Sequence, residues 1–172
     1  MTKLEAILMG LLAERNRTGY ELLKVISASP SFGVRATAGS VYPALQRLVK
    51  AGLILAADAS SGARPASSYR LTQKGESALE GWLREPVAVG TAEETEDLLL
   101  RVLFSDRMPT DYLRSLLSAY LREMKAQVAS LEASAAAWVA MPLRQRLCLE
   151  NGLRSARTQV EWAERALTEL GE

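Results

Sequence analysis

Residues 38–55, which read AGSVYPALQRLVKAGLIL, constrain the fold of this chain more than any other stretch. Ser40 is predicted to cap a helix, because its hydroxyl can accept a hydrogen bond from a free amide of the first turn. Pro43 fits that first turn, where a missing N–H costs nothing, and Gly52 supplies the left-handed residue that ends a helix. We therefore expect a short helix that leads directly into a strand.

This helix is expected to have one apolar face and one polar face. Helical spacing places four apolar side chains on one stripe, those of Val41, Leu45, Leu48 and Val49. The side chains that lie largely off this stripe are those of Tyr42, Gln46, Arg47 and Lys50. Such a polar row suits insertion into a DNA groove. It fits equally well an ordinary amphipathic helix whose polar side faces water.

Composition excludes several classes of protein. The chain has 172 residues, and 48% of them are hydrophobic, which is enough for a core. Cys148 is the single cysteine and histidine is absent, so we expect no disulfide framework, no zinc site and no cofactor. An enzyme would lack the commonest general base, and no nucleotide-binding or nucleophile motif occurs. Without a signal peptide or a membrane-length apolar run, we expect a cytoplasmic protein with no membrane partner.

The two halves of the chain carry opposite charge. Residues 1–84 have 11 Lys and Arg against 6 Asp and Glu, a net charge of +5, whereas residues 85–172 have 10 against 14, a net charge of −4. A basic half joined to an acidic half is typical of a nucleic-acid-binding module on an assembly module. Chance alone also produces differences of this size.

Apolar periodicity predicts three short helices in the first half, at residues 2–15, at residues 18–28 and in the stretch already described. Thr18 and Glu21 form a capping box at the start of the second of these helices. Three helices in this order make a helix-turn-helix unit, whose last helix reads DNA. Two short strands follow, at residues 53–57 and 67–71, and they predict a β-hairpin, the wing of a winged helix. Thr72 then caps a further helix that ends near residue 84.

The second half is predicted to be helical throughout. Residues 85–90 read as a linker, and a second capping box at Thr91 and Glu94 starts the next helix. Long helices follow at residues 110–139 and after Pro142, and their apolar residues keep the 4–3 spacing of helix-on-helix packing. Two long helices leave apolar surface exposed, and a twofold dimer is the simplest way to cover it.

The expected fold is therefore mostly α. Residues 1–85 should form a winged helix-turn-helix DNA-binding domain of three to four helices and a two-stranded β wing. Residues 86–172 should form an α-helical dimerisation domain that also offers a place for sensing an effector.

Four motifs resemble the PadR family of transcriptional regulators. They are TGYEL at residues 18–22, GSVYPALQRLVKAGLI at 39–54, RPASSYRLTQKG at 64–75 and LLLRVLF at 98–104. The last motif and the closing helix resemble the members with a longer C-terminal domain. The resemblance implies a homodimeric repressor that binds a palindromic operator in double-stranded DNA. Members of this family often respond to small aromatic or drug-like ligands that release them from DNA.

The resemblance also implies which residues touch DNA. On the reading helix they are Ser40, Tyr42, Pro43, Gln46 and Arg47. Gln46 can form paired hydrogen bonds with adenine.

Two further elements of the first half, a helix start and the wing, are candidates for DNA contact. Thr18 and Tyr20 lie at a helix start that suits a phosphate, although Tyr20 fits a core position equally well. Arg64 and Arg70 are the wing candidates, and Arg70 is also placed to pair with Glu76.

Five aromatic residues are candidates for lining an effector site, and each fits a plain core role as well: Trp82, Phe104, Tyr120, Trp138 and Trp162. The competing interpretation of the whole chain is a winged-helix adaptor that binds proteins without specific DNA binding, since a fold alone does not decide function. Salt-dependent DNA binding distinguishes the two.

Overall fold

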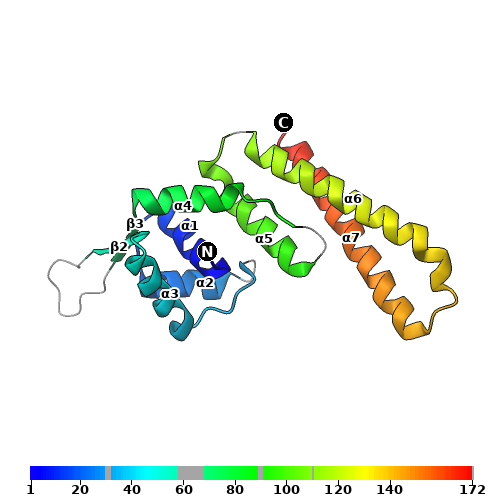
Figure 1. Cartoon of the computed structure of the whole chain (residues 1–172), viewed down its shortest axis with the longest axis horizontal. Helices are drawn as coiled ribbons and strands as arrows, with labels where there is room; N and C mark the ends of the chain where they lie inside the picture. Colours follow the sequence, from blue (N-terminus) through cyan, green and yellow to red (C-terminus); the bar gives the residue numbers. More distant parts are fainter. Residues whose placement is uncertain (30–31, 58–67, 89–90, 110, 172) are drawn as a thin grey trace. The chain divides into compact units, whose positions relative to one another are not determined.

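The computed structural model describes the chain except for residues 30–31, 58–67, 89–90, 110 and 172 (Figure 1). The chain divides into two compact units. The first unit is Met1–Pro86 with Glu96–Arg107, and the second is Val87–Thr95 with Met108–Glu172. None of the helices in the described ranges has the length and apolar character needed to cross a membrane. The expected roles of residues 1–85 and 86–172 in DNA binding and dimerisation stay predictions.

The first unit contains the predicted helices in the predicted order. They are α1 (Lys3–Glu14), α2 (Gly19–Ala28), α3 (Ala38–Lys50) and α4 (Gln73–Arg84). The capping box at the start of α2 is present, because Thr18 Oγ1 accepts from the Glu21 N–H at 3.2 Å and Glu21 Oε2 accepts from the Thr18 N–H at 2.7 Å. Thr2 and Glu5 cap α1 in the same way. The mostly helical, winged-helix fold expected from the sequence is confirmed.

The sheet of this unit has one strand more than predicted. The strands β1 (Arg17–Thr18), β2 (Ile54–Ala57) and β3 (Ser68–Leu71) are antiparallel and lie in the order β1-β3-β2. The hairpin of β2 and β3 is the predicted wing, in which Ile54 pairs with Leu71. The predicted two-stranded wing is therefore confirmed, and β1 is an additional strand that was not predicted, because a two-residue strand carries no alternation that a sequence pattern could reveal.

Three details of α3 differ from the prediction. Because the helix begins at Ala38, Pro43 lies inside it and not in its first turn. The N-cap is Thr37 and not Ser40, and the Ser40 hydroxyl instead accepts a hydrogen bond from the Thr37 N–H at 3.0 Å. Val49 is 37% exposed, whereas Ala44 is fully buried with Val41 and Leu45. The buried stripe of α3 is therefore turned slightly away from the stripe that the sequence indicated.

Helix α1 lies at the centre of the first unit and packs against α3, α4 and β3. Every residue of α1 from Ala6 to Leu12 is buried, including Gly10. Arg17 is also buried, and it donates to the Leu11 carbonyl oxygen and, at 2.6 Å, to Glu14 Oε2. These bonds hold the short segment between α1 and α2 against the core.

The second unit is a helical hairpin of α6 (Tyr112–Trp138) and α7 (Leu143–Glu169), which pack along each other (Figure 1). The preceding helix α5 (Ala92–Leu103) contributes residues 92–95 to this unit and residues 96–103 to the first. Tyr120 of α6 meets Trp162 of α7 edge to face, with the ring centroids 6.1 Å apart. The Tyr120 hydroxyl donates to Gln159 Oε1 at 3.1 Å and so fixes the register of the two helices.

Candidate nucleic-acid interface

Helix α3 presents a polar outer face. Val41, Ala44 and Leu45 are fully buried beneath it. The side chains of the predicted reading residues on the other face are exposed, namely those of Tyr42, Pro43, Gln46 and Arg47. Ser40 is half-buried and its hydroxyl is bonded to the backbone of Thr37. Apart from Ser40, the residues expected to read DNA thus share one accessible face of a helix whose opposite face is fixed in the core.

The Tyr42 ring lies across Gly19, the first residue of α2. A Cβ atom at Gly19 would come within 2.7 Å of Tyr42 Cε1 and 3.4 Å of Leu45 Cδ1. The missing side chain therefore lets α3 approach the start of α2 closely, and this brings the Tyr42 surface beside the other DNA candidates, Thr18 and Tyr20. Tyr20 is 68% exposed, so the alternative core position for this residue does not apply.

The close contact between the Tyr42 ring and Gly19 leads to a testable prediction. Gly19→Ala should lower the free energy of unfolding by about 1 kcal/mol, since the added methyl group overpacks the contact. In a Tyr42→Ser background the same change should be neutral or stabilising, because the ring is gone and alanine favours helix. Urea denaturation of the four proteins of this double-mutant cycle measures the coupling. If Gly19→Ala changed the free energy of unfolding equally in both backgrounds, the Tyr42 ring would not be in close contact with Gly19.

The start of α2 is partly occupied by its own cap. Hydrogen bonds from the Thr18 N–H and hydroxyl hold the pKa of the Glu21 carboxyl below its ordinary value, so the group is ionised at neutral pH. A phosphate approaching this helix end therefore meets the amides beyond Thr18 and the Tyr20 hydroxyl rather than the Thr18 amide. A phosphate contact at Thr18 and Tyr20 stays a prediction.

Arg47 has a partner that sequence reasoning missed. Its Nε donates to Glu5 Oε1 of α1 at 2.9 Å, and the two side chains are 57% and 14% exposed respectively. Burial raises the pKa of the Glu5 carboxyl, but hydrogen bonds from Thr2 and Arg47 outweigh it and leave that pKa below its ordinary value. Because 42 residues separate Glu5 from Arg47, no local spacing could have indicated this pair.

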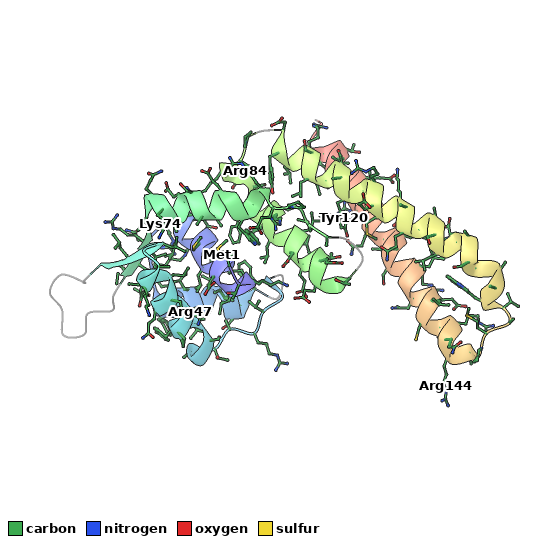
Figure 2. The ribbon with its side chains drawn as sticks, viewed as in Figure 1. Met1, Arg47, Lys74, Arg84, Tyr120 and Arg144 are labelled. Carbon is green, nitrogen blue, oxygen red and sulfur yellow. The ribbon has the colours of Figure 1, made fainter. Side chains whose placement is uncertain are left out.

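Of the two wing candidates, Arg64 and Arg70, only Arg70 lies within the described residues. Arg70 is exposed on β3, and Glu76 pairs with Arg107 at 3.6 Å rather than with Arg70. Arg70 has no ion pair within the described part of the chain, and its side chain stays accessible to DNA. Arg64 lies outside the described residues. Lys74, marked in Figure 2, donates to the Ala51 carbonyl oxygen at 2.8 Å and ties α4 to the end of α3.

The five aromatic candidates for an effector site fall in different units. Trp82 is buried beneath the Arg101 guanidinium, whose carbon lies 4.5 Å from the ring centroid, and Phe104 is buried against Gly10. These two side chains are core residues of the first unit. The structure does bring Tyr120, marked in Figure 2, together with Trp162 in the second unit.

Trp138, the remaining candidate, is buried at the C-terminal end of α6, where its Nε1 donates to Ser134 Oγ at 3.2 Å. Burial raises the pKa of Tyr120, and a hydrogen bond with Thr95 acts against this rise.

A groove of about 220 Å³ runs between α6 and α7, over an apolar floor of Val128, Ala129 and Val160. None of the five aromatic candidates is among the residues that line this groove.

Residues 8–81 match the model of the PadR-like family of transcriptional regulators, and residues 95–171 match the model of the virulence activator alpha C-terminal domain. No curated protein sequence matches the chain. PadR of Bacillus subtilis, solved in complex with operator DNA, is 22% identical, with 97% of this chain and 98% of that one covered and a TM-score of 0.46.

Two further solved structures are similar over comparable lengths. A PadR-like regulator of Bacillus cereus is 22% identical, with 98% of each chain covered and a TM-score of 0.42. The virulence activator AphA of Vibrio cholerae is 27% identical, with 98% of each chain covered and a TM-score of 0.44. The chain therefore combines a PadR-like transcriptional regulator domain with a C-terminal domain of the virulence activator alpha type.

Proposed function

We propose that this regulator is a homodimeric repressor that recognises a palindromic operator. In this proposal α3 of each copy enters one major groove, with Tyr42, Gln46 and Arg47 facing the bases and phosphates. The observation that carries the proposal is the two-faced character of α3, whose outer row is exposed while its inner row is fully buried. The net charge of +5 on residues 1–84 favours the approach of this half to DNA.

The proposed dimer is supported by the apolar surface of the second unit. Val139, Leu143 and Leu147, at the turn between α6 and α7, are exposed, and so is Leu170 at the end of α7. A monomer rarely leaves this many large apolar side chains in water, whereas a second copy related by a twofold axis would cover them. A twofold dimer would also match the symmetry of a palindromic operator.

We further propose that a small aromatic ligand lowers the affinity for DNA by binding in the second unit near Tyr120 and Trp162. Trp162 is partly exposed, and the hydroxyl of the buried Tyr120, which donates to Gln159 Oε1, can still accept a hydrogen bond. Titration with a hydroxycinnamic acid should change the tryptophan fluorescence of the protein and weaken operator binding. Release requires that the ligand prefer the form of the dimer that misfits the operator.

Footprinting on the DNA that flanks its own gene tests the DNA-binding proposal. The purified protein should protect a twofold-symmetric site, bind it in the range of about 10⁻⁸–10⁻¹¹ M and lose affinity steeply as salt rises. Sedimentation should give twice the mass of one chain. Equal binding to operator and scrambled duplex would favour the adaptor interpretation, and a single-chain mass at micromolar concentration would contradict the dimer.

A further inference from the structure

The ion pair between Glu5 and Arg47 joins the reading helix to the central helix of the first unit. Arg47 is mostly exposed on α3, whereas Glu5 is mostly buried at the start of α1. The bond uses only Nε of the guanidinium. Among the described residues, neither terminal nitrogen of Arg47 has a hydrogen-bond partner, so both stay available to an acceptor outside the protein.

The carboxylate that holds Arg47 is itself held in place. Glu5 Oε2 accepts from the Thr2 N–H at 3.0 Å, while Glu5 Oε1 accepts from Arg47 Nε at 2.9 Å. The Glu5 backbone N–H in turn donates to Thr2 Oγ1 at 3.2 Å. Both oxygens are therefore committed, one to the cap of α1 and one to Arg47, and the carboxylate has little freedom to turn.

We propose that Glu5 is a positioning residue for DNA reading, which orients the Arg47 guanidinium so that its two terminal amino groups point at the operator. The inference rests on the proposed function and names a determinant of specificity outside the reading helix. A guanidinium whose plane is fixed in advance loses less conformational entropy on binding, and it can meet guanine or a phosphate with two parallel hydrogen bonds.

The geometry favours positioning over masking. A carboxylate that shielded Arg47 from DNA would engage the terminal amino groups, because these are the groups that form paired bonds with bases and phosphates. Glu5 instead binds the inner nitrogen from the core side. The two roles have opposite consequences, since removing a mask strengthens DNA binding and removing a positioning group weakens it.

The test is operator affinity of the full-length protein carrying Glu5→Gln, measured by fluorescence anisotropy on operator and scrambled duplexes. The variant should bind operator about three- to tenfold more weakly, a smaller loss than complete removal of a paired base contact can cause, because the contact is loosened and not lost. It should bind scrambled DNA no more weakly than the parent, because it has lost a negative charge. Glu5→Asp, which keeps the charge but draws the carboxylate back from Nε, should also weaken operator binding.

A double-mutant cycle separates positioning from a merely structural role. If Glu5 acts through Arg47, then Glu5→Gln should change operator affinity by less than about twofold in an Arg47→Ala background. Thr72→Ala is the matched control for the loss of a helix cap, since it removes the cap hydroxyl of α4 in the same unit and leaves the bonds of Glu5 in place. Glu80→Gln is the control for charge, since it breaks the exposed pair of Glu80 with Arg84 elsewhere in the same unit. Both controls should bind operator like the parent.

Several outcomes would overturn the inference. Tighter operator binding by Glu5→Gln would show that Glu5 masks Arg47, and unchanged binding by both Glu5 variants would show that it has no role. An equal loss in the Arg47→Ala background, or the same loss in Thr72→Ala, would assign the effect to the stability of the first unit. In each of these cases the proposed function still stands, because the parent binds its operator. A parent that prefers no duplex would overturn the proposed function and this inference together.

Discussion

Gly75→Ala is expected to lower the free energy of unfolding of the first unit by about 2–3 kcal/mol, the range for overpacking a rigid site. Gly75 lies in the first turn of α4, and a Cβ atom there would collide with the backbone carbonyl of Leu53 and come within 2.8 Å of Leu71 Cδ1. The same carbonyl accepts from the Thr72 N–H at 3.1 Å and from Thr72 Oγ1 at 3.0 Å. Because backbone atoms block the site, no side-chain rotation can relieve the collision.

Gly81→Ala is the matched control for this prediction. Gly81 is on the same helix, and a Cβ atom there meets nothing within 4 Å. This substitution should stabilise the protein by up to about 1 kcal/mol, since alanine favours helix over glycine. Urea denaturation followed by circular dichroism compares the two variants. If both changed stability in the same direction, the close approach of α4 to Leu53 would not be a constraint on the fold.

Gln46→Ala is expected to weaken specific operator binding by about 1–3 kcal/mol, because a side-chain amide paired with adenine contributes this much discrimination. Gln46 is exposed on the outer face of α3, and its amide has no hydrogen-bond partner within the described residues. Truncation should therefore leave the folded protein intact. Binding to scrambled duplex should hardly change, since the amide carries no charge.

Gln145→Ala removes the same amide from an exposed position on α7 and serves as the control. It should bind operator like the parent. Anisotropy titrations at fixed salt measure both variants, and a base-substituted operator identifies the position that Gln46 reads. If Gln46→Ala retained parental affinity for every such duplex, Gln46 would not be a base-reading residue.

The helices and the wing could be predicted because residues close together in the sequence determine where these elements begin and end. The capping boxes at Thr18 and Thr91 each lie within four residues and marked helix starts correctly. The proline at position 142 and the glycine at position 52 likewise marked true boundaries. The wing followed from two runs of strand-forming residues on either side of polar turn residues.

The parts that were not predictable depend on tertiary contacts. Val49 was expected in the buried stripe of α3 and is exposed, while Ala44, which was not assigned to that stripe, is buried, because the angle at which α3 meets α1 is set by packing. Trp82 and Phe104 were grouped with Tyr120 by residue type alone, and the chain places them in different units. Helical spacing predicted that Gln46 and Arg47 lie on the exposed face of α3. It could not predict the ion pair of Arg47 with Glu5, because two helices that are distant in sequence share no common periodicity.

The short strand β1 has a mechanical consequence. Arg17 and Thr18 pair with Tyr69 and Ser68 of β3, and α2 begins at the very next residue. If the wing contacts DNA as predicted, a displacement of β3 would be carried through these backbone hydrogen bonds to the first turn of α2. The wing and the start of α2 would then adjust to an operator together and not independently.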